Sequence, residues 1–340
     1  MTLIGMLHHR ADPSNVKKAY AYAAVAKAEG VNFFYFTPGK VNIKQQKILG
    51  KVYENGQWIE KEFPFPDAIY NASYPVNEKA EQIVDYLSDR IPFTSHSIGD
   101  KLDVYNRIKR AEKFEPYLIP FYEVTDVQMF FDIIKRYEKV IIKPLTGHQG
   151  VGVVFIEKDG VDHYKINDAG LVSSINEKQL LNLISHIIQD QDYLVQKFIS
   201  SKTKTGHVFN FRLHVQKNGE GKWVITSIYP RIGQLGVITS NMGSYSTYLD
   251  TFLKIEFGDS WYDIRRDLEK FAIRFSNHFD SLYDIELDEL GIDVGIDANE
   301  KLWLFEVNWR PGSPVIYHLE LDVAKNTILY AKYLADTNKH

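Results

Sequence analysis

The chain contains no cysteine. This absence excludes a disulfide framework, a thiolate nucleophile and a cysteine-ligated zinc site, and it is compatible with a reducing cytosol. Long apolar runs are also missing: no segment approaches the ~18 residues that a membrane helix needs. Residues 1–10 lack the long hydrophobic region and the small-residue cleavage site of a secretory signal. We therefore expect a cytoplasmic protein with no membrane partner.

Charge of one sign is not in excess. The 340 residues include 40 Lys and Arg against 44 Asp and Glu, a net charge of −4. This balance gives no reason to expect nucleic acid as a partner. Apolar residues make up 44% of the chain, which is ordinary for a globular protein, and the length suits two or three packed subdomains.

Strands alternate with helices near the N-terminus, which indicates a parallel sheet. Residues 3–7 and 31–37 have the apolar and β-branched composition of strands, and an alanine-rich helix is expected over residues 16–29 with Ser14 as its cap. A domain boundary is expected near residues 92–100.

The rest of the chain continues as a mixture of helices and strands. We expect a flexible loop at residues 233–248 and an antiparallel hairpin formed by strands 289–297 and 302–308. The other expected strands are 139–144, 151–157, 193–199, 208–217 and 222–230, and the expected helices are 101–114, 126–137, 176–189, 262–278 and 322–334.

The segment after strand 139–144 is rich in glycine, with Gly147, Gly150 and Gly152 enclosing His148 and Gln149. Glycine allows sharp bends and lets N–H groups approach an anion. Lys143 would add a positive charge there. The segment is not a Walker A loop, because no Gly-Lys-Ser/Thr follows, and it is not a Rossmann fingerprint, because a strand follows. It is either a phosphate-binding flap or an ordinary hairpin turn.

Oxygen-bearing side chains recur on the 289–308 hairpin. Alternate residues of a strand share a face, so Glu306 and Asn308 point the same way, and Asp293 can meet them from the partner strand. Three hard oxygen ligands suit Mg²⁺. The alternative is a solvent-facing polar hairpin, but apolar neighbours such as Ile292 and Val307 disfavour it, since unpaired carboxylates among them would be costly.

Two arginines occur in otherwise apolar strands. Arg212 and Arg231 each need a carboxylate or phosphate partner. A structural salt bridge would explain one of them. Two such residues between the glycine segment and the hairpin favour binding of a triphosphate and an acyl phosphate. Lys101, at the start of an expected helix, carries no distinguishing context of its own.

Taken in chain order, these features resemble the ATP-grasp superfamily over roughly residues 95–335. The segment 195–199, the Asn210-x-Arg212 pair and the Glu306-Val307-Asn308 ending are similar to glutathione synthetase-like members. Segments 216–223, 231–233 and 237–241 resemble the YheC/YheD group of endospore coat-associated proteins. The resemblance implies an α/β (α+β) ATP-grasp fold with an N-terminal Rossmann-like pre-ATP-grasp domain. The implied ranges are 1–95 for that domain, 96–192 for a central subdomain with the glycine flap, and 193–340 for a C-terminal subdomain with the metal site.

The resemblance also implies roles for individual residues. Lys101 and Lys143 would contact the phosphates, and the backbone of residues 196–199 would bind adenine. Asn210 stands where relatives often have Asp, so its ribose contact would be weaker, and Gln196 stands where many have Glu. The implied nucleotide-binding set is Lys101, Lys143, Gly147, His148, Gln149, Gly150, Gly152, Gln196, Lys197, Phe198, Ile199 and Asn210. The implied metal ligands are Asp293, Glu306 and Asn308, the catalytic residues Lys143, Arg212 and Arg231, and the substrate-binding residues Arg231, Asn241, Gly243, Ser244, Arg310 and Ser313.

The activity implied by the resemblance is ligation of a carboxylate to an amine with ATP and Mg²⁺. The γ-phosphoryl group would pass to the carboxylate, and a small-molecule or peptide amine would displace phosphate from the acyl phosphate. Two alternatives remain: a kinase that stops after phosphoryl transfer, and a spore-associated nucleotide-binding protein without turnover. Spore association and a homodimer also remain open.

Overall fold

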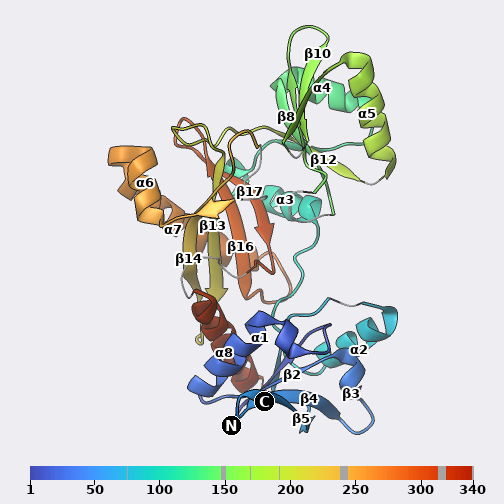
Figure 1. Cartoon of the computed structure of the whole chain (residues 1–340), viewed down its shortest axis with the longest axis vertical. Coiled ribbons are helices and arrows are strands. Elements are labelled where there is room, and N and C mark those ends of the chain that lie inside the picture. The colour runs from blue at the N-terminus through green and yellow to red at the C-terminus, as the bar shows by residue number, and fades with distance from the viewer. Residues whose placement is uncertain are drawn as a thin grey trace.

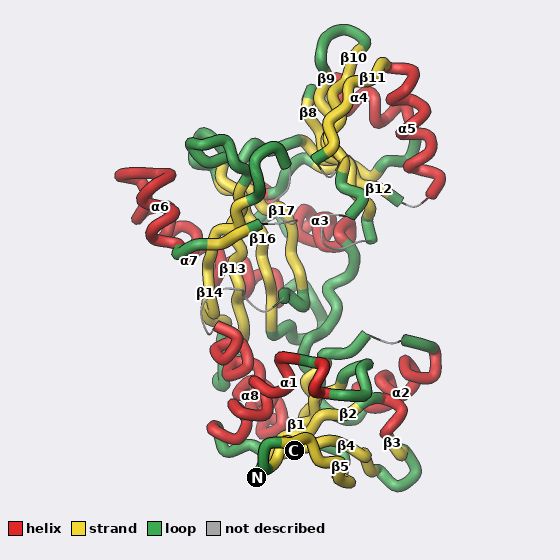
Figure 2. The backbone as a smooth tube through the Cα atoms, viewed as in Figure 1, coloured by secondary structure: helices red, strands yellow, loops and turns green. Residues whose placement is uncertain are grey.

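The computed structural model describes residues 1–74, 76–146, 151–168, 170–190, 192–237, 244–312 and 319–338. Three β-sheets are arranged along the long axis of the molecule (Figure 1). The first sheet in the chain lies at one end, the third in the middle and the second at the other end. Loops gather between the second and third sheets (Figure 2).

The first sheet belongs to an N-terminal α/β unit. Its strand order is β3-β4-β2-β1-β6, with β5 paired to β4, and β1 is parallel to both β2 and β6. Helix α1 (Lys17–Ala28) connects β1 to β2, and α2 (Glu78–Ser88) begins after an Asn77 cap whose side chain accepts from the Ala80 N–H. The strands are β1 (Leu3–Leu7), β2 (Asn32–Phe36), β3 (Val41–Asn42), β4 (Lys47–Glu54), β5 (Gln57–Pro64) and β6 (Ala68–Asn71).

The second sheet has the order β11-β10-β9-β8-β12-β7. Helices α4 (Val127–Tyr137) and α5 (Glu177–Asp190) pack against it, and buried side chains such as Phe130 and Ile184 meet Val140 in a shared core. The strands are β7 (Phe121–Glu123), β8 (Lys139–Pro144), β9 (Val154–Lys158), β10 (His163–Asp168), β11 (Leu171–Asn176) and β12 (Tyr193–Lys197).

The third sheet, of order β15-β14-β13-β16-β17, is antiparallel. Helix α7 (Trp261–Asp280) packs against it through Leu268, Phe271, Phe275 and Phe279, whose spacing forms one apolar stripe of a helix. The remaining helices here are α3 (Lys101–Arg110), α6 (Leu249–Phe257) and α8 (Leu319–Thr337), and the strands are β13 (Phe209–Lys217), β14 (Trp223–Ile232), β15 (Tyr245–Ser246), β16 (Glu289–Ile296) and β17 (Leu302–Asn308). The 3₁₀ helices of the chain are η1 (Pro13–Asn15), η2 (Pro38–Lys40), η3 (Glu115–Tyr117) and η4 (Gly258–Ser260).

The two faces of the third sheet differ in polarity. Along β13 the apolar residues Phe211, Leu213 and Val215 belong to the core with α7, while the alternating residues Arg212 and His214 project from the opposite face. Both sets are buried. A buried polar face requires internal partners, and this requirement organises the site described below.

Two helices and one strand cross the domain boundaries expected from sequence. Helix α8 packs on α1 through Ala324 and Ile328, and the Gln216 side chain on β13 donates to the Val323 carbonyl (3.2 Å), so α8 joins the first unit to the third sheet. Helix α3 contributes Val104 to the core of the third sheet. The second sheet extends through β12 to Lys197, beyond the expected boundary at residue 192.

Several expected elements agree with the structure, including the strands at 3–7, 139–144 and 302–308. The expected cap of the first helix is wrong: Ser14 lies within η1, whose own cap is Asp12, and α1 begins at Lys17. Among the described helices, none combines the length and hydrophobicity that crossing a lipid bilayer would require.

Candidate active site

Lys143 is the penultimate residue of β8, the strand that leads to the glycine segment. Its ammonium group donates to the Tyr105 hydroxyl (2.9 Å), and burial lowers the pKa of Lys143 to about 8, an effect that the nearby Glu306 partly opposes. The Tyr105 hydroxyl in turn donates to the Phe305 carbonyl on β17. One hydrogen-bonded chain therefore connects the second sheet, α3 and the third sheet.

The glycine segment joins β8 to β9. Gly147, His148, Gln149 and Gly150 lie outside the described residues. Gly152 has a φ of +74°, and a Cβ there would come within 3.3 Å of the Pro144 ring. Both observations explain why glycine is needed at this position.

Lys101 lies at the first position of α3. The helix begins with a capping box in which Asp100 and Asp103 each accept from the other's backbone N–H. The ammonium group of Lys101 donates to the Leu145 carbonyl (3.3 Å) and lies 3.9 Å from the Glu306 carboxylate. Burial lowers the pKa of Lys101, while Glu306 raises it.

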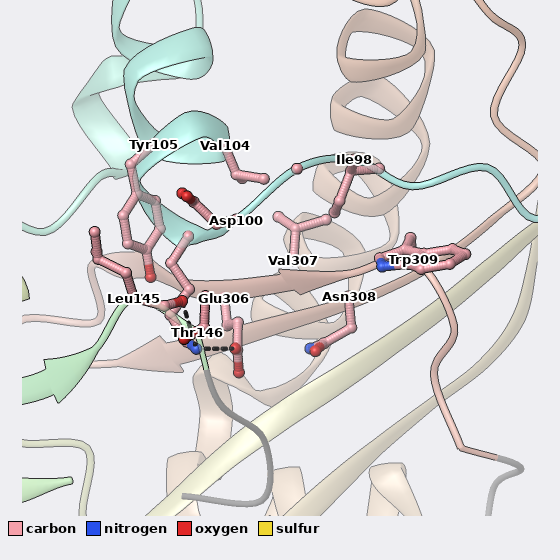
Figure 3. A pocket seen from close by; sticks show the side chains of 12 residues that line it. Ile98, Asp100, Val104, Tyr105, Leu145, Thr146, Glu306, Val307, Asn308 and Trp309 are labelled. Atoms are coloured by element: carbon pink, nitrogen blue, oxygen red, sulfur yellow. Dashed lines mark hydrogen bonds and ion pairs between the residues drawn. The ribbon is translucent and has the colours of Figure 1, made fainter. Parts of the chain in front are cut away.

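These groups border a cavity of about 310 Å³. Figure 3 shows Glu306 and Asn308 on the same side of β17 and Val307 on the other side, with Tyr105 on the facing helix α3 and Asp100 just before it. The structure thus brings four predicted residues to one cavity region. They are Lys101, Glu306 and Asn308, which line the cavity, and Lys143, which contacts its Tyr105 wall.

Asp293 lies beside Glu306 in the strand register, but its partners are arginines. Arg212 donates from Nε to Oδ1 (2.5 Å) and from Nη2 to Oδ2 (3.0 Å), and Nη2 of Arg231 lies 2.7 Å from Oδ2. Burial alone would raise the pKa of Asp293, but Arg212 and Arg231 outweigh it and hold the pKa below its usual range. Both arginines therefore have the carboxylate partner that a buried arginine in an apolar strand requires.

Asn210 has a different partner from the expected ribose. Its side-chain oxygen accepts from Nε of Arg231 (3.0 Å), and the residue is buried on β13. Asn210 and Asp293 together fix the Arg231 guanidinium group. Asn210 thus positions Arg231, and its ribose contact stays a prediction.

Of the three predicted Mg²⁺ ligands, Glu306 and Asn308 have an oxygen available for a cation, whereas Asp293 is occupied by arginines. Glu306 is about one quarter exposed (27%), and the amide nitrogen of Asn308 faces the Gly291 carbonyl at 3.5 Å, which turns the amide oxygen away from it. These two oxygen groups at the cavity fit a hard cation that retains water. Asp293 could bind a metal cation only if the cation displaced Arg212 or Arg231 from its carboxylate. Among the described residues, no cluster of three or more His, Cys, Asp or Glu suited to a metal is present.

The predicted adenine strand lies at the end of β12. The amides of Lys197 and Phe198 already donate to the Pro120 and Lys139 carbonyls (3.1 and 2.9 Å). Within segment 196–199, and as far as the structure describes the chain, the N–H of Ile199 is the amide that donates to no backbone carbonyl. The buried Gln196 side chain hydrogen-bonds Tyr105 and is therefore directed toward the lysine pair.

The predicted acceptor residues are only partly described. Asn241, Gly243 and Ser313 lie outside the described residues. Ser244 is half-buried just before β15. Arg310 follows β17, packs on the Trp309 ring with its guanidinium carbon 4.1 Å from the ring centre, and donates to the Ser73 carbonyl of the first unit.

Sequence reasoning missed Tyr105 and Trp309. Tyr105 is four residues after Lys101, so the two share one face of α3, and this spacing was the available signal. Trp309 lines the cavity directly after Asn308. Its alternation with Val307 was visible in the sequence, but a tryptophan beside an apolar strand is usually a packing residue.

The three-sheet α/β arrangement defines an ATP-grasp fold. In it, Lys143, just before the glycine segment, lies near the strand that carries Glu306 and Asn308. Crystal structures support this class: D-alanyl-alanine synthetase A from Vibrio cholerae has a TM-score of 0.57 at 12% identity, with 99% of this chain and 98% of that chain covered. N5-carboxyaminoimidazole synthetase from Staphylococcus aureus also has a TM-score of 0.57 at 12% identity, with 96% and 77% covered.

The chain belongs to the YheC/D like ATP-grasp family, whose model matches residues 90–334. Two relatives from Bacillus subtilis (strain 168) are similar along most of their length. The endospore coat-associated protein YheD is 25% identical over 322 residues, covering 89% of this chain and 70% of the relative. The endospore coat-associated protein YheC is 24% identical over 304 residues, covering 83% and 81%.

Proposed function

We propose that this protein is an ATP-dependent ligase that joins a carboxylate to an amine. The observation that carries the proposal is the meeting of Lys101, Lys143, Glu306 and Asn308 at one cavity region between the second and third sheets. Two cations and two oxygen donors in one place suit a nucleotide triphosphate. Solved structures of the same fold include enzymes named as ligases and synthetases, which supports this activity class.

Lys101 and Lys143 would neutralise the phosphates. Lys143 is held by Tyr105, which limits its motion, and its low pKa reflects the partial loss of water around it. In a poorly solvated site each charge–charge interaction is stronger than in water. Glu306 and Asn308 would hold Mg²⁺, which would supply further neutralisation of phosphate charge.

Arg212 and Arg231 would provide fixed positive charge beside the transferring group. Asp293 holds both, and Asn210 holds Arg231 from a second side. Guanidinium groups fixed before the reaction need not reorganise as charge develops. Asp293 therefore acts as an anchor for the arginines in this proposal, and its predicted role as a metal ligand becomes secondary.

The reaction has two steps. A carboxylate oxygen attacks the γ-phosphorus of ATP, the bond to the β-phosphate oxygen breaks, and ADP leaves. The nitrogen of a neutral amine then attacks the carbonyl carbon of the acyl phosphate and forms the C–N bond. The carbon–oxygen bond to phosphate breaks, phosphate leaves with its electron pair, and the nitrogen loses a proton to solvent. The residues at the cavity orient the reactants and stabilise charge, so the scheme needs no side-chain nucleophile.

Product analysis tests the proposal. The purified protein with ATP and Mg²⁺ is screened against acid–amine pairs for ADP, phosphate and condensed product. A ligase releases phosphate in equal amount with an amide and depends on the amine. Stable phosphorylated product without an amine would identify a kinase, and ATP binding without ADP formation from any pair would favour a nucleotide-binding protein.

We also propose that the protein acts in association with the spore, because both curated relatives are named endospore coat-associated proteins. Immunodetection in purified spores of the source organism tests this, with mother-cell cytoplasm as the comparison. Its absence from spore fractions at every stage of sporulation would contradict the proposal.

A further inference from the structure

The strand order of the N-terminal unit contains a switch point that the candidate ATP site does not use. Strand β1 continues through α1 to β2 on one side, while β6 pairs on the other side of β1. The connection order therefore reverses between β1 and β6. Ligands of open α/β sheets bind beyond the carboxyl ends of strands at such a switch point. The residues just beyond these ends are His8 and His9 after β1, and Ser73 and Tyr74 after β6.

Two cationic side chains, Lys18 and Arg310, meet the imidazole rings of His8 and His9 at this position, and the four residues are here called the cation cluster. The rings of His8 and His9 stack with centroids 4.3 Å apart. Lys18 donates to the Tyr70 hydroxyl (3.3 Å) from the first turn of α1, a turn that contains no acidic residue. Arg310 arrives from the end of β17 and lies 4.9 Å from the centre of the Tyr74 ring.

No carboxylate is paired directly with the cation cluster. In the described parts of the chain, no ion pair joins His8, His9, Lys18 or Arg310 to a carboxylate, and the buried atoms Nδ1 of His9 and Nε of Arg310 have no hydrogen-bond partner. Burial lowers the pKa of His8 to about 4, and every charged neighbour that contributes to this shift is cationic. Lys18 and Arg310 therefore carry the charge of the cluster, and two cations without a directly paired carboxylate favour a bound anion.

The acids nearest to the cation cluster already have partners. Asp288 accepts from the Ser95 N–H at 2.6 Å, and burial raises the pKa of Asp288 to about 7. Glu289 is hydrogen-bonded to His214 at 2.7 Å. The pKa of Tyr70 is raised mainly by burial, and the charges of Glu289 and Asp288 add to this shift. Neither forms an ion pair with the cluster, although the charge of Asp288 acts on Arg310 and raises its pKa, against the larger lowering by burial.

We propose that the cation cluster binds a second anionic group of the acid substrate. This inference rests on the proposed ligase function and names its substrate class: a carboxylic acid that carries another carboxylate or a phosphate. The two places adjoin in the chain, because Arg310 is two residues beyond Asn308, the last residue of β17. Trp309 connects the two places, since it lines the cavity and packs on Arg310.

Matched acids and matched lysines test the inference. Binding of glutarate, 4-phosphonobutyrate and pentanoate is measured by calorimetry on the full chain with a non-hydrolysable ATP analogue and Mg²⁺. The variants are Lys18→Met and, as the control, Lys17→Met, which removes the exposed lysine one position earlier. Acid-dependent ADP formation is measured in parallel with glutamate against glutamine. Thermal unfolding and ATP affinity verify that each variant is folded.

We expect a dianion to bind at least about tenfold more tightly than pentanoate, as for a charged hydrogen bond. Lys18→Met should remove most of this preference, and Lys17→Met should keep it. A preference for glutarate over 4-phosphonobutyrate, or the reverse, distinguishes a second carboxylate from a phosphate. Equal binding of all three acids, binding of none, or a matching loss of ATP affinity in Lys18→Met would overturn the inference. In each of those cases, ADP formation that depends on an acid and an amine would still support the ligase proposal. Conversely, dianion binding without turnover would support the anion site at the cation cluster and not the ligase proposal.

Discussion

Replacing Asp293 by asparagine separates an anchoring role from a role in metal binding. The substitution keeps the shape of the side chain and removes its charge. In the wild type, two oxygens of Asp293 receive three close guanidinium contacts from Arg212 and Arg231, and the residue is only 3% exposed. The asparagine side chain would present an amide nitrogen to one of these guanidinium groups and leave two buried arginines without a counter-charge.

The magnitude follows from the burial. Removing one partner of a buried ion pair costs about 3–5 kcal/mol, because the remaining charge stays desolvated. We therefore expect Asp293→Asn to lower the free energy of unfolding by about that amount. The pKa of Asp293 is held low, so the stabilisation is fully present above the unfolded pKa of about 4 and is lost as the pH falls through the lower folded value. The difference between wild type and variant should be constant from about pH 8 to about pH 5 and shrink below about pH 4.

Urea unfolding followed by tryptophan fluorescence measures this difference. Four of the five tryptophans lie in residues 223–309, close to Asp293 in the chain, so the signal reports the third sheet. Glu306→Gln is the matched comparison, because Glu306 is partly exposed and has one cation at 3.9 Å. We expect it to unfold like the wild type, to bind nucleotide and to lose turnover. If Asp293→Asn were as stable as Glu306→Gln, the anchoring role would be refuted.

Two further predictions concern the phosphate side of the cavity, and a third concerns the glycine segment. The kcat/KM for ATP should fall as the pH rises through about 8, because Lys143 loses its charge there; Lys143→Arg should remove this decline, and an unchanged profile in that variant would assign it to another group. Tyr105→Phe removes the hydroxyl that connects Lys143 to β17, so we expect the KM for ATP to rise several-fold with little change in the fold, whereas an unaltered KM would contradict a positioning role. Gly152→Ala should destabilise the protein by about 1 kcal/mol or more, since its φ is +74°, and Gly39→Ala, with nothing within 4 Å of its Cβ position, is the control; equal melting temperatures would exclude strain at Gly152.

The hairpin that carries Glu306 and Asn308 was predictable because its signal is local. Side chains two residues apart on a strand share a face whatever the rest of the chain does. The polar connector between two apolar runs fixed the pairing, and the observed register places Asp293 opposite Glu306. For the same reason β1, β8 and β17 could be bounded correctly from their composition.

The partners of Asp293 could not be predicted from that pattern. Arg212 and Arg231 come from β13 and β14, and only the order β14-β13-β16 brings both to one carboxylate. The sequence showed three buried charges that each needed a partner, but several pairings satisfied that need. Asn210 was assigned to ribose through resemblance, and the structure directs it to Arg231 because the two are direct cross-strand neighbours.

The cation cluster was hidden for the same physical reason. His8, Lys18 and Arg310 come from three parts of the chain, and each alone resembles an ordinary surface or core residue. Helix α8 and the end of β17 return to the first unit, a connection that the expected division of the chain at residue 95 separated. Long-range contacts of this kind leave no periodicity in the sequence.

A crystal structure of the protein with Mn²⁺ and a non-hydrolysable ATP analogue tests the central claim most directly. Anomalous scattering locates the cation without ambiguity. The account predicts Mn²⁺ within ~2.2 Å of oxygens of Glu306 and Asn308, with the phosphates between Lys101 and Lys143. A nucleotide bound elsewhere, or a cation remote from both residues, would contradict it.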